Sequence, residues 1–387
     1  MLKKLLQITS LCILLTACGQ EEEKAPQVPE PDIKLVPAEF SALPGWRKDN
    51  FADAKKAFGY SCEKIAKIKT PWLGTAEIKV PTAAYQNLCR QLADLSPAEF
   101  KKLVEKDFRP WLVENQGNPK GKFTSYYEAA LRASYRPGPV YKYPIYGIPE
   151  DLVEINLQDF DPTLPRKKLF GRVEGQKFIP YYTRDEITSR GIDAPVILWT
   201  DSYIDLYIMQ IQGSAVAELE DGGKIRIAYA GNNGHEFTGI GKILLENKVI
   251  KPGQASMGNI KKWLRENVDT ADFFLNQNRR YIFHRLSSAE GPLGAQGVPL
   301  TAGRSLAVDR RYVPLGSLLW LETTLPGHQP LQRLMVAQDI GSAIKGAVRG
   351  DYFWGSGGDE ILESAGKMNA EGKYYILLPR NQEENHD

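Results

Sequence analysis

The chain has 387 residues, with 49 basic and 47 acidic side chains and a formal net charge of +2. This balance excludes the large basic excess that nucleic-acid-binding proteins normally carry, so we expect no nucleic-acid partner. The length is too great for one small core and fits two domains, while the 42% hydrophobic and 25% charged contents are those of an ordinary globular protein.

The amino-terminal residues have the pattern of a lipoprotein signal. Lys3 and Lys4 precede an apolar run over residues 5–17, which is too short to span a bilayer but suits a secretory signal. The run ends in LTAC, which resembles a bacterial lipobox, so we expect residues 1–17 to be removed and Cys18 to carry diacylglycerol. A plain secretory signal with a chance cysteine is the alternative. By resemblance to lipoprotein sorting signals, Gly19 permits transfer to the outer membrane, which predicts anchoring on its periplasmic face.

A tether and a helical block follow the signal. Residues 18–37 are rich in Glu and Pro and poor in apolar side chains, which predicts a flexible tether. Apolar residues then recur at steps of three or four over 51–65 and 85–95, and Ser96, Pro97 and Glu99 form a capping-box pattern before a third helix.

Two cysteines remain within this helical block, Cys62 and Cys89. In an oxidising periplasm the pair could form a disulfide, but each occupies an apolar helix position where a buried thiol is also common. Both alternatives stay open from the residues alone.

The pattern changes at residue 121 to short β-like runs separated by Gly and Pro, which continue to about residue 230. A second helical stretch covers about 241–276, with Ile260, Trp263, Leu264 and Val268 expected on one face. Strand-like runs then resume toward the carboxyl end. An inserted β domain that splits the first domain is the simplest explanation of this alternation.

Asp339 and Asp351 are the leading catalytic candidates. They lie among glycines and aromatic residues in LMVAQDIGSAIKGAVRGDYFWGSG, where glycines permit close approach of a ligand and aromatic faces suit sugar rings. Burial against Tyr352 and Trp354 would raise the pKa of Asp351 and make it a general acid for glycoside cleavage. Asp339 ends a strand-like run and could position a hydroxyl or raise the pKa of Asp351 by like-charge repulsion. A turn or loop cap beside glycine is the structural alternative for each.

Other polar groups could bind a sugar. Gln210 and Gln212 lie two residues apart in YIMQIQGSA, which on a strand places both amides on one side, where they suit hydroxyl and N-acetyl groups. A strand with one polar face is the alternative. Tyr126, Tyr127 and Glu128 in FTSYYEA could line a groove or be ordinary strand residues.

Asp309 lies in a polar cluster with Arg304, Arg310 and Arg311, where a surface ion-pair cluster is the default and a groove floor is possible.

Metal, nucleotide and covalent mechanisms have little support in the sequence. The four histidines show no paired zinc-type spacing, no serine occupies a nucleophile elbow, and no glycine run has the phosphate-binding pattern. We therefore expect no metal and no cofactor.

Several motifs together resemble one family, the membrane-bound lytic murein transglycosylases of type A. FTSYYEA is similar to its FTGYYEP, DLYIMQIQGSA to its DLFFLQIQGSG, and AQGVPLTAGRSLAVDRRYVPLGS to its AQGVPLTPGRSLAVD, while QDIGSAIKG and GDYFWG resemble QDTGGAIKG and ADFFWG. The sequence differs from these family motifs at five positions, and none of the differences removes a carboxylate or a glutamine: Ser125, Ala129, Ala215, Ile340 and Ser342.

The resemblance implies a mainly β fold with helices, in which a double-psi β-barrel domain carries a second, inserted β domain and a groove between them holds a glycan strand. It implies that Asp351 is catalytic, that Asp339 supports it, and that Asp309 lies at the same site. We also expect Ser214 and Lys345, which lie in two of the motifs, to contact substrate. The expected divisions after the tether are 38–124 for the helical part of the barrel domain, 125–243 for the insert, 244–380 for the catalytic part and 381–387 for a polar tail.

The family reaction cleaves the β-1,4 bond between N-acetylmuramic acid and N-acetylglucosamine and leaves a 1,6-anhydro ring on the muramoyl product. Because the sugar's own hydroxyl attacks, one acid suffices. A two-carboxylate peptidoglycan hydrolase and a non-catalytic murein-binding module are the alternatives. The expected partners are glycan strands, outer-membrane lipid and other cell-wall enzymes, and we expect a monomer.

Overall fold

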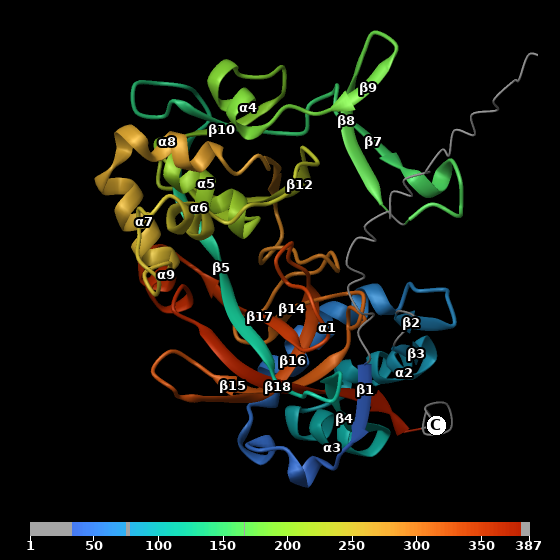
Figure 1. Cartoon of the computed structure of the whole chain (residues 1–387). Coiled ribbons are helices and arrows are strands. Elements are labelled where there is room, and N and C mark those ends of the chain that lie inside the picture. Colours follow the sequence, from blue (N-terminus) through green and yellow to red (C-terminus); the bar gives the residue numbers. More distant parts are fainter. Residues whose placement is uncertain (1–32, 75–77, 166, 381–387) are drawn as a thin grey trace, which may run out of the picture. The chain divides into compact units, whose positions relative to one another are not determined.

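The computed structural model describes residues 33–74, 78–165 and 167–380 (Figure 1). The expected signal, the lipidation site Cys18 and the tail 381–387 lie outside these residues. None of the helices in the described ranges has the length and apolar character that crossing a membrane requires. The fold is mainly β with helices, as the sequence predicts.

Thirteen strands from distant parts of the chain form one large sheet. They are β1 (Ile33–Pro37), β4 (Phe108–Asn115), β5 (Gly121–Ser134), β6 (Tyr143–Tyr146), β10 (Val196–Thr200), β11 (Ala215–Leu219), β12 (Lys224–Asn232), β13 (Ile282–Ser287), β14 (Ser305–Val308), β15 (Leu318–Thr324), β16 (Pro330–Asp339), β17 (Arg349–Ser356) and β18 (Asn369–Pro379). Residues 33–37 therefore form a strand against β4, although the expected tether extended to residue 37. Pairing with β4 satisfies the backbone of this segment, while Ile33 and Leu35 pack against the core.

Six of these strands close into a ring. Their order is β18-β15-β16-β14-β17-β5, and β18 also pairs with β5. The interior positions are apolar because the strands of the ring supply buried residues such as Trp320, Val336 and Ile376. The double-psi description of this ring and the groove beside it stay predictions.

Three helices cover the ring: α1 (Phe51–Ile65), α2 (Thr82–Gln91) and α3 (Pro97–Asp107). The predicted capping box is present, since Ser96 and Glu99 exchange hydrogen bonds at the start of α3. Cys62 of α1 and Cys89 of α2 form a disulfide, which resolves the open choice in favour of the cross-link.

The second half of β5 leads into a separate hydrophobic core (Figure 1). The helices of this part are α4 (Arg184–Arg190), α5 (Tyr203–Gln212), α6 (Ile240–Glu246), α7 (Met257–Glu266), α8 (Val268–Asn276) and α9 (Asp359–Ala365). Strands β7 (Val153–Asn156), β8 (Lys168–Glu174) and β9 (Lys177–Pro180) form a small sheet of their own, and β2 (Trp72–Gly74) pairs with β3 (Lys79–Pro81). Four short 3-10 turns in the described ranges were not predicted from the sequence: Phe40–Ala42, Trp46–Lys48, Leu92–Asp94 and Leu157–Asp159.

The segment from Tyr203 to Gln212 is a helix, so the prediction that Gln210 and Gln212 share one side of a strand is wrong. Ser202 caps the helix by accepting a hydrogen bond from the N–H of Asp205. The apolar residues lie on nearly all sides of α5, as expected of a helix that is buried on most of its surface. Residues two apart on a helix point about 200° apart, so the two amides face different neighbours.

Helices α6, α7 and α8 confirm the second helical stretch, and Ile260 and Leu264 are buried on its inner face. Val268 is exposed, contrary to expectation, because a new helix begins at this residue and changes the direction of the chain. These helices pack in the same core as α5, whereas the sequence grouped residues from 244 onward with the catalytic part. The domain boundaries stay a prediction.

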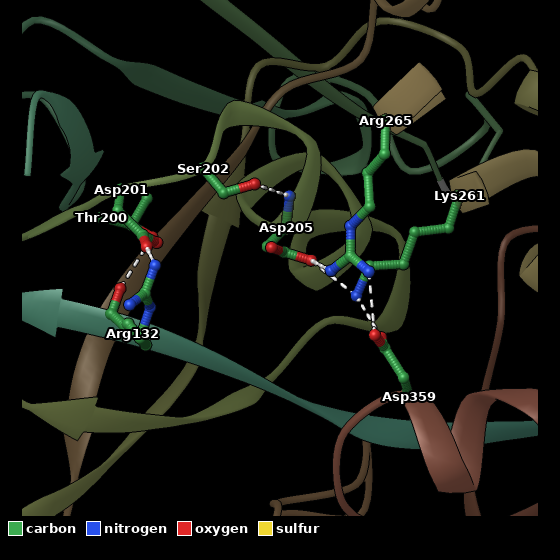
Figure 2. Close-up of polar contacts among 8 residues, drawn as sticks. All are labelled: Arg132, Thr200, Asp201, Ser202, Asp205, Lys261, Arg265 and Asp359. Atoms are coloured by element: carbon green, nitrogen blue, oxygen red, sulfur yellow. Dashed lines mark hydrogen bonds and ion pairs between the residues drawn. The ribbon is translucent and has the colours of Figure 1, made fainter. Parts of the chain in front are cut away.

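A network of charged side chains joins α5, α7 and α9 (Figure 2). The buried Lys261 places its Nζ 2.7 Å from Asp205 Oδ1 and 2.7 Å from Asp359 Oδ1, and Arg265 Nη1 lies 2.8 Å from Asp359 Oδ2. The hydrogen bond from Lys261 is the largest of the effects that lower the pKa of Asp359. Because α9 follows β17 directly, the network fixes the chain beyond that strand to the helices of the second core.

Candidate active site

Four neighbouring strands of the ring place four residues in one row. Asp339 of β16 lies opposite Ala307 of β14, Ala307 lies opposite Asp351 of β17, and Asp351 lies opposite Thr124 of β5. Residues opposite one another in a sheet point to the same face, and adjacent strands are about 4.8 Å apart. The row therefore brings both predicted carboxylates near one another, and the charge of Asp339 raises the pKa of Asp351, although β14 and β16 change register between Leu306 and Ala307.

Asp351 is part-buried and is influenced by charges of both signs, those of Arg349 and Asp339. The Thr124 hydroxyl donates a hydrogen bond to Asp351 Oδ1, and Arg349 Nη2 in turn donates to Thr124 Oγ1 at 2.7 Å. Burial is the main cause that raises the pKa of Asp351 to about 6, and the nearby charge of Asp339 raises it further, whereas Thr124 and Arg349 lower it. A carboxyl with this pKa can both hold and release a proton near neutral pH.

Asp339 is held by three hydrogen bonds at the end of β16. Its Oδ1 accepts from the backbone N–H groups of Ala295 and Ile340, both at 2.9 Å, and its Oδ2 accepts from the Tyr126 hydroxyl at 2.8 Å. Burial raises the pKa of Asp339, and these three hydrogen bonds to the charged form oppose that rise. The arrangement fixes the orientation of this carboxylate beside the catalytic candidate.

Tyr126 and Phe353 form the aromatic side of the site. They lie opposite each other on β5 and β17, and their ring centroids are 5.2 Å apart. Burial and the charge of Asp339 raise the pKa of Tyr126 well above its usual value, so its hydroxyl keeps the proton that it donates. Tyr126 therefore lies against Asp339, and its contact with substrate stays a prediction.

Tyr352 and Trp354 do not surround Asp351, contrary to expectation. Successive residues of a strand point to opposite faces, so these two side chains lie on the other side of β17. Their rings contact each other with centroids 5.6 Å apart, and the Tyr352 hydroxyl accepts a hydrogen bond from Arg333 at 3.2 Å. Asp351 is therefore buried by other neighbours than the sequence suggested.

Asp309 follows β14 and is paired with Arg311. Burial would raise the pKa of Asp309, but hydrogen bonds from the Arg311 side chain and from the backbone N–H of Gly346 outweigh burial and lower it. The bond to Gly346 holds the loop that leads into β17, and the neighbouring Lys345 side chain is exposed on that loop. Arg304 instead pairs with Asp49 at 2.8 Å, so the predicted polar cluster is divided.

The remaining candidates lie further along β5 or on α5. Glu128 is fully buried, its Oε1 accepts from Arg226 Nε at 2.8 Å, and its Oε2 accepts from Ser356. Gln212 Oε1 accepts from the backbone N–H of Tyr127 at 3.2 Å, which ties α5 to β5.

Gln210 is buried with its Nε2 3.4 Å from the carbonyl oxygen of Ile282, and Ser214 is buried just beyond the helix. Five predicted site residues therefore lie outside the row of Asp351, and their expected contacts with sugar stay predictions: Tyr127, Glu128, Gln210, Gln212 and Ser214.

Thr124, Arg349 and Ala307 were not singled out from the sequence. Thr124 lies two residues before Tyr126, and Arg349 lies two residues before Asp351. On a strand, this spacing places both members of each pair on one face, so a strand assignment could have indicated Thr124 and Arg349. Ala307 carries no chemistry, so only the strand register reveals it.

The site combines several groups that are suited to proton transfer. Within residues 33–74, 78–165 and 167–380, no group of three or more His, Cys, Asp or Glu side chains is arranged to hold a metal ion. A tunable carboxyl, a fixed carboxylate and a protonated tyrosine can support acid and base catalysis on an uncharged leaving group.

Comparison with known proteins gives consistent matches. Residues 122–285 match the family model described as MltA specific insert domain, and residues 304–378 match the 3D domain. Membrane-bound lytic murein transglycosylase A of Escherichia coli K12 is 31% identical over 275 residues, covering 68% of this chain and 67% of the relative. The crystal structure of MltA from Neisseria gonorrhoeae is 34% identical, covers 90% of this chain and 93% of that chain, and has a TM-score of 0.77. A membrane-bound lytic murein transglycosylase from Agrobacterium tumefaciens is 32% identical, covers 92% and 100%, and has a TM-score of 0.79.

Proposed function

The chain belongs to the membrane-bound lytic murein transglycosylase A family and is a peptidoglycan lytic transglycosylase, and we propose that Asp351 carries out both proton transfers of its reaction. The observation that supports this role is the row of Asp339, Ala307, Asp351 and Thr124, in which burial raises the pKa of Asp351 to about 6. The substrate bond is the β-1,4 linkage between N-acetylmuramic acid and N-acetylglucosamine.

In the first step, protonated Asp351 donates its proton to the glycosidic oxygen as the bond to the anomeric carbon breaks. The Thr124 hydroxyl donates to Asp351 Oδ1, which leaves Oδ2 as the oxygen that carries the proton toward the substrate. The carboxylate of Asp339 supplies negative charge near the oxocarbenium-like centre and is itself kept in place by Tyr126.

In the second step, the Asp351 carboxylate accepts the proton of the muramoyl sugar's primary hydroxyl while that oxygen bonds to the anomeric carbon. The product is a 1,6-anhydro ring, and Asp351 regains the proton it gave away. No water is consumed, because the nucleophile belongs to the substrate itself.

Asp351→Asn tests this role. We expect the variant to release no anhydromuropeptides from purified sacculi, at least about 10³-fold less than the wild type, since the only proton donor for the leaving group is lost. Asp269→Asn serves as the matched control, because Asp269 is an exposed acid on α8 that lies outside the row. Substantial cleavage by Asp351→Asn would transfer the acid role to Asp339 or Asp309.

Mass spectrometry of the products separates this reaction from hydrolysis. Anhydro products are lighter by one water than hydrolytic products, so ordinary reducing muramic acid ends would favour a hydrolase that uses Asp339 and Asp351 as a pair. Glycan binding without any released product would favour a murein-binding module.

We propose a glycan-binding groove between the ring and the inserted part, with the exposed Lys345 and the residues near Asp309 on its wall. The domain limits 38–124, 125–243 and 244–380 and a monomeric state belong to this proposal. Recruitment by other cell-wall enzymes would use surfaces outside the catalytic row.

Anchoring through acylated Cys18 is a further part of the proposal, supported by the lipobox and by relatives that are named membrane-bound. Metabolic labelling with radioactive palmitate checks it, with Cys18→Ala as the control. Label in the wild-type chain that is absent from the variant, together with outer-membrane fractionation, is the expected result.

A further inference from the structure

A pocket lies in the inserted part, away from the catalytic row. Its volume is about 250 Å³, and it lies where β6, α4, α5 and α8 meet. Strand β5 connects the two places. Thr124 of β5 is opposite Asp351, and Ala133 lies nine residues further along the same strand. Ala133 is opposite Thr200, and Thr200 is opposite Tyr143 at the pocket. Nine residues of extended strand span roughly 30 Å, so the pocket is outside the immediate surroundings of the scissile bond.

The floor of this pocket is aromatic. Tyr203, Tyr146 and Tyr281 line it and are almost fully buried. The rings of Tyr143 and Tyr203 have centroids 5.9 Å apart, and those of Tyr146 and Tyr281 are 6.4 Å apart. Such rings present flat apolar faces together with hydroxyl groups at their edges, which suits a ligand with one apolar and one polar side.

The rim of the pocket is polar. Asn276 is fixed there, because its Oδ1 accepts from the Tyr203 hydroxyl at 2.9 Å and from Thr188 Oγ1 at 3.3 Å, while its Nδ2 donates to Asp185 Oδ1 at 2.9 Å. Asp272 is exposed at the same rim, and its carboxylate makes no hydrogen bond or ion pair with any residue in the described part of the chain. Both of its oxygens are therefore available to accept hydrogen bonds from a ligand.

The charges around the pocket favour an uncharged ligand. The guanidinium of the buried Arg184 lies 5.2 Å from the centroid of Tyr281, behind the aromatic floor, and forms no ion pair with a described residue. This positive charge disfavours an ammonium group deep in the pocket, and Asp272 at the rim disfavours a carboxylate. A neutral ring with several hydroxyl groups satisfies both conditions.

We propose that this pocket binds one sugar ring of a glycan strand and forms a second murein-holding site. The proposal rests on the proposed function, because it takes its ligand from the same polymer. A tyrosine ring would contact the apolar face of the sugar, while Asp272 accepts hydrogen bonds from its hydroxyl or amide groups and the remaining N–H of Asn276 donates one. Two attachment points on one polymer raise the local concentration of glycan at the catalytic row, an advantage that a short fragment cannot use.

The test compares Asp272→Ala with Asp269→Ala, which removes an exposed acid from the same helix outside the pocket. For each variant the rate on intact sacculi is divided by the rate on soluble glycan fragments too short to reach both sites. We expect this ratio to fall on the order of tenfold for Asp272→Ala, since one charge-assisted hydrogen bond is lost, and to stay at the wild-type value for Asp269→Ala. An unchanged ratio for Asp272→Ala would overturn the proposal.

Calorimetric titration identifies the ligand. The tetramer of N-acetylglucosamine is titrated into Asp351→Asn, and we expect two bound molecules, of which one is lost when Asp272→Ala or Tyr143→Leu is added. A pocket that binds the free peptide stem but not the tetramer refutes the sugar assignment. Failure of Asp351→Asn to abolish cleavage, by contrast, concerns only the proposed function and leaves the ratio of rates interpretable, because that ratio is measured in variants that keep Asp351.

Discussion

Asp351→Asn is expected to stabilise the fold while it removes cleavage. Asn resembles the protonated form of Asp in shape but carries no charge. Burial raises the pKa of Asp351 from 3.8 to about 6, so the ionised form that prevails at neutral pH is less favourable in the folded protein than in the unfolded chain. The substitution removes this cost together with the catalytic proton.

The magnitude follows from the size of the pKa shift. An acid whose pKa is higher in the folded state contributes stability below the unfolded pKa and loses it as the pH rises through the folded pKa. At about 1.4 kcal/mol per pKa unit, the rise from 3.8 to about 6 corresponds to about 3 kcal/mol at neutral pH. For a chain of this length, about 3 kcal/mol raises the Tm by roughly 4 °C.

Thermal unfolding at two pH values is the assay. We expect the gain in Tm at about pH 7.5 to shrink to a small fraction at about pH 4, where wild-type Asp351 is already protonated. Asp309→Asn is the matched control and should lower the Tm at neutral pH, because Arg311 and Gly346 lower the pKa of Asp309 despite its burial. A Tm for Asp351→Asn at or below the wild-type value at neutral pH would refute the reasoning.

Three further predictions follow from the same contacts. Cleavage should slow roughly tenfold between about pH 5 and about pH 7, because the protonated fraction of an acid with a pKa of about 6 falls from about 0.9 to about 0.1; a rate that rises over this interval contradicts the acid role. Ala307→Val should lower kcat more than tenfold with little change in KM, since Ala307 is the register partner of both Asp339 and Asp351 and a larger side chain would displace these strands, and Ala307→Gly, which adds no bulk, is its control. Reduction of the Cys62–Cys89 disulfide, which closes a separation of 27 residues, should destabilise the protein by about 3.5 kcal/mol in denaturant unfolding, and Cys62→Ser should show the same loss without reductant.

The strands that carry the site were largely predictable from the sequence. FTSYYEA and RLMVAQD have the apolar content of buried strands, and both form strands in the structure. Asp339 lies at the end of its strand as expected. These predictions succeeded because each depends on residues that are neighbours in the sequence.

The pairing of strands could not be predicted in the same way. Asp351 lies opposite Thr124, which is more than 200 residues away in the sequence, and no local pattern sets that register. The residues that bury Asp351 were therefore misjudged: its sequence neighbours Tyr352 and Trp354 point to the other face, whereas Tyr126 comes from a distant strand. The glutamine pair failed for another reason, since an apolar run of ten residues fits a buried helix as well as a strand.

One strand joins the catalytic row to the inserted part. The first half of β5 supplies Thr124 and Tyr126 to the site, and its second half pairs with β11 and β10. Between these halves, the buried Glu128 binds Arg226 of β12 and Ser356 at the end of β17. The length of β5 between Thr124, the register partner of Asp351, and Ala133 therefore separates the acid from the pocket, and a glycan bound at both places would be held in a fixed register along that strand.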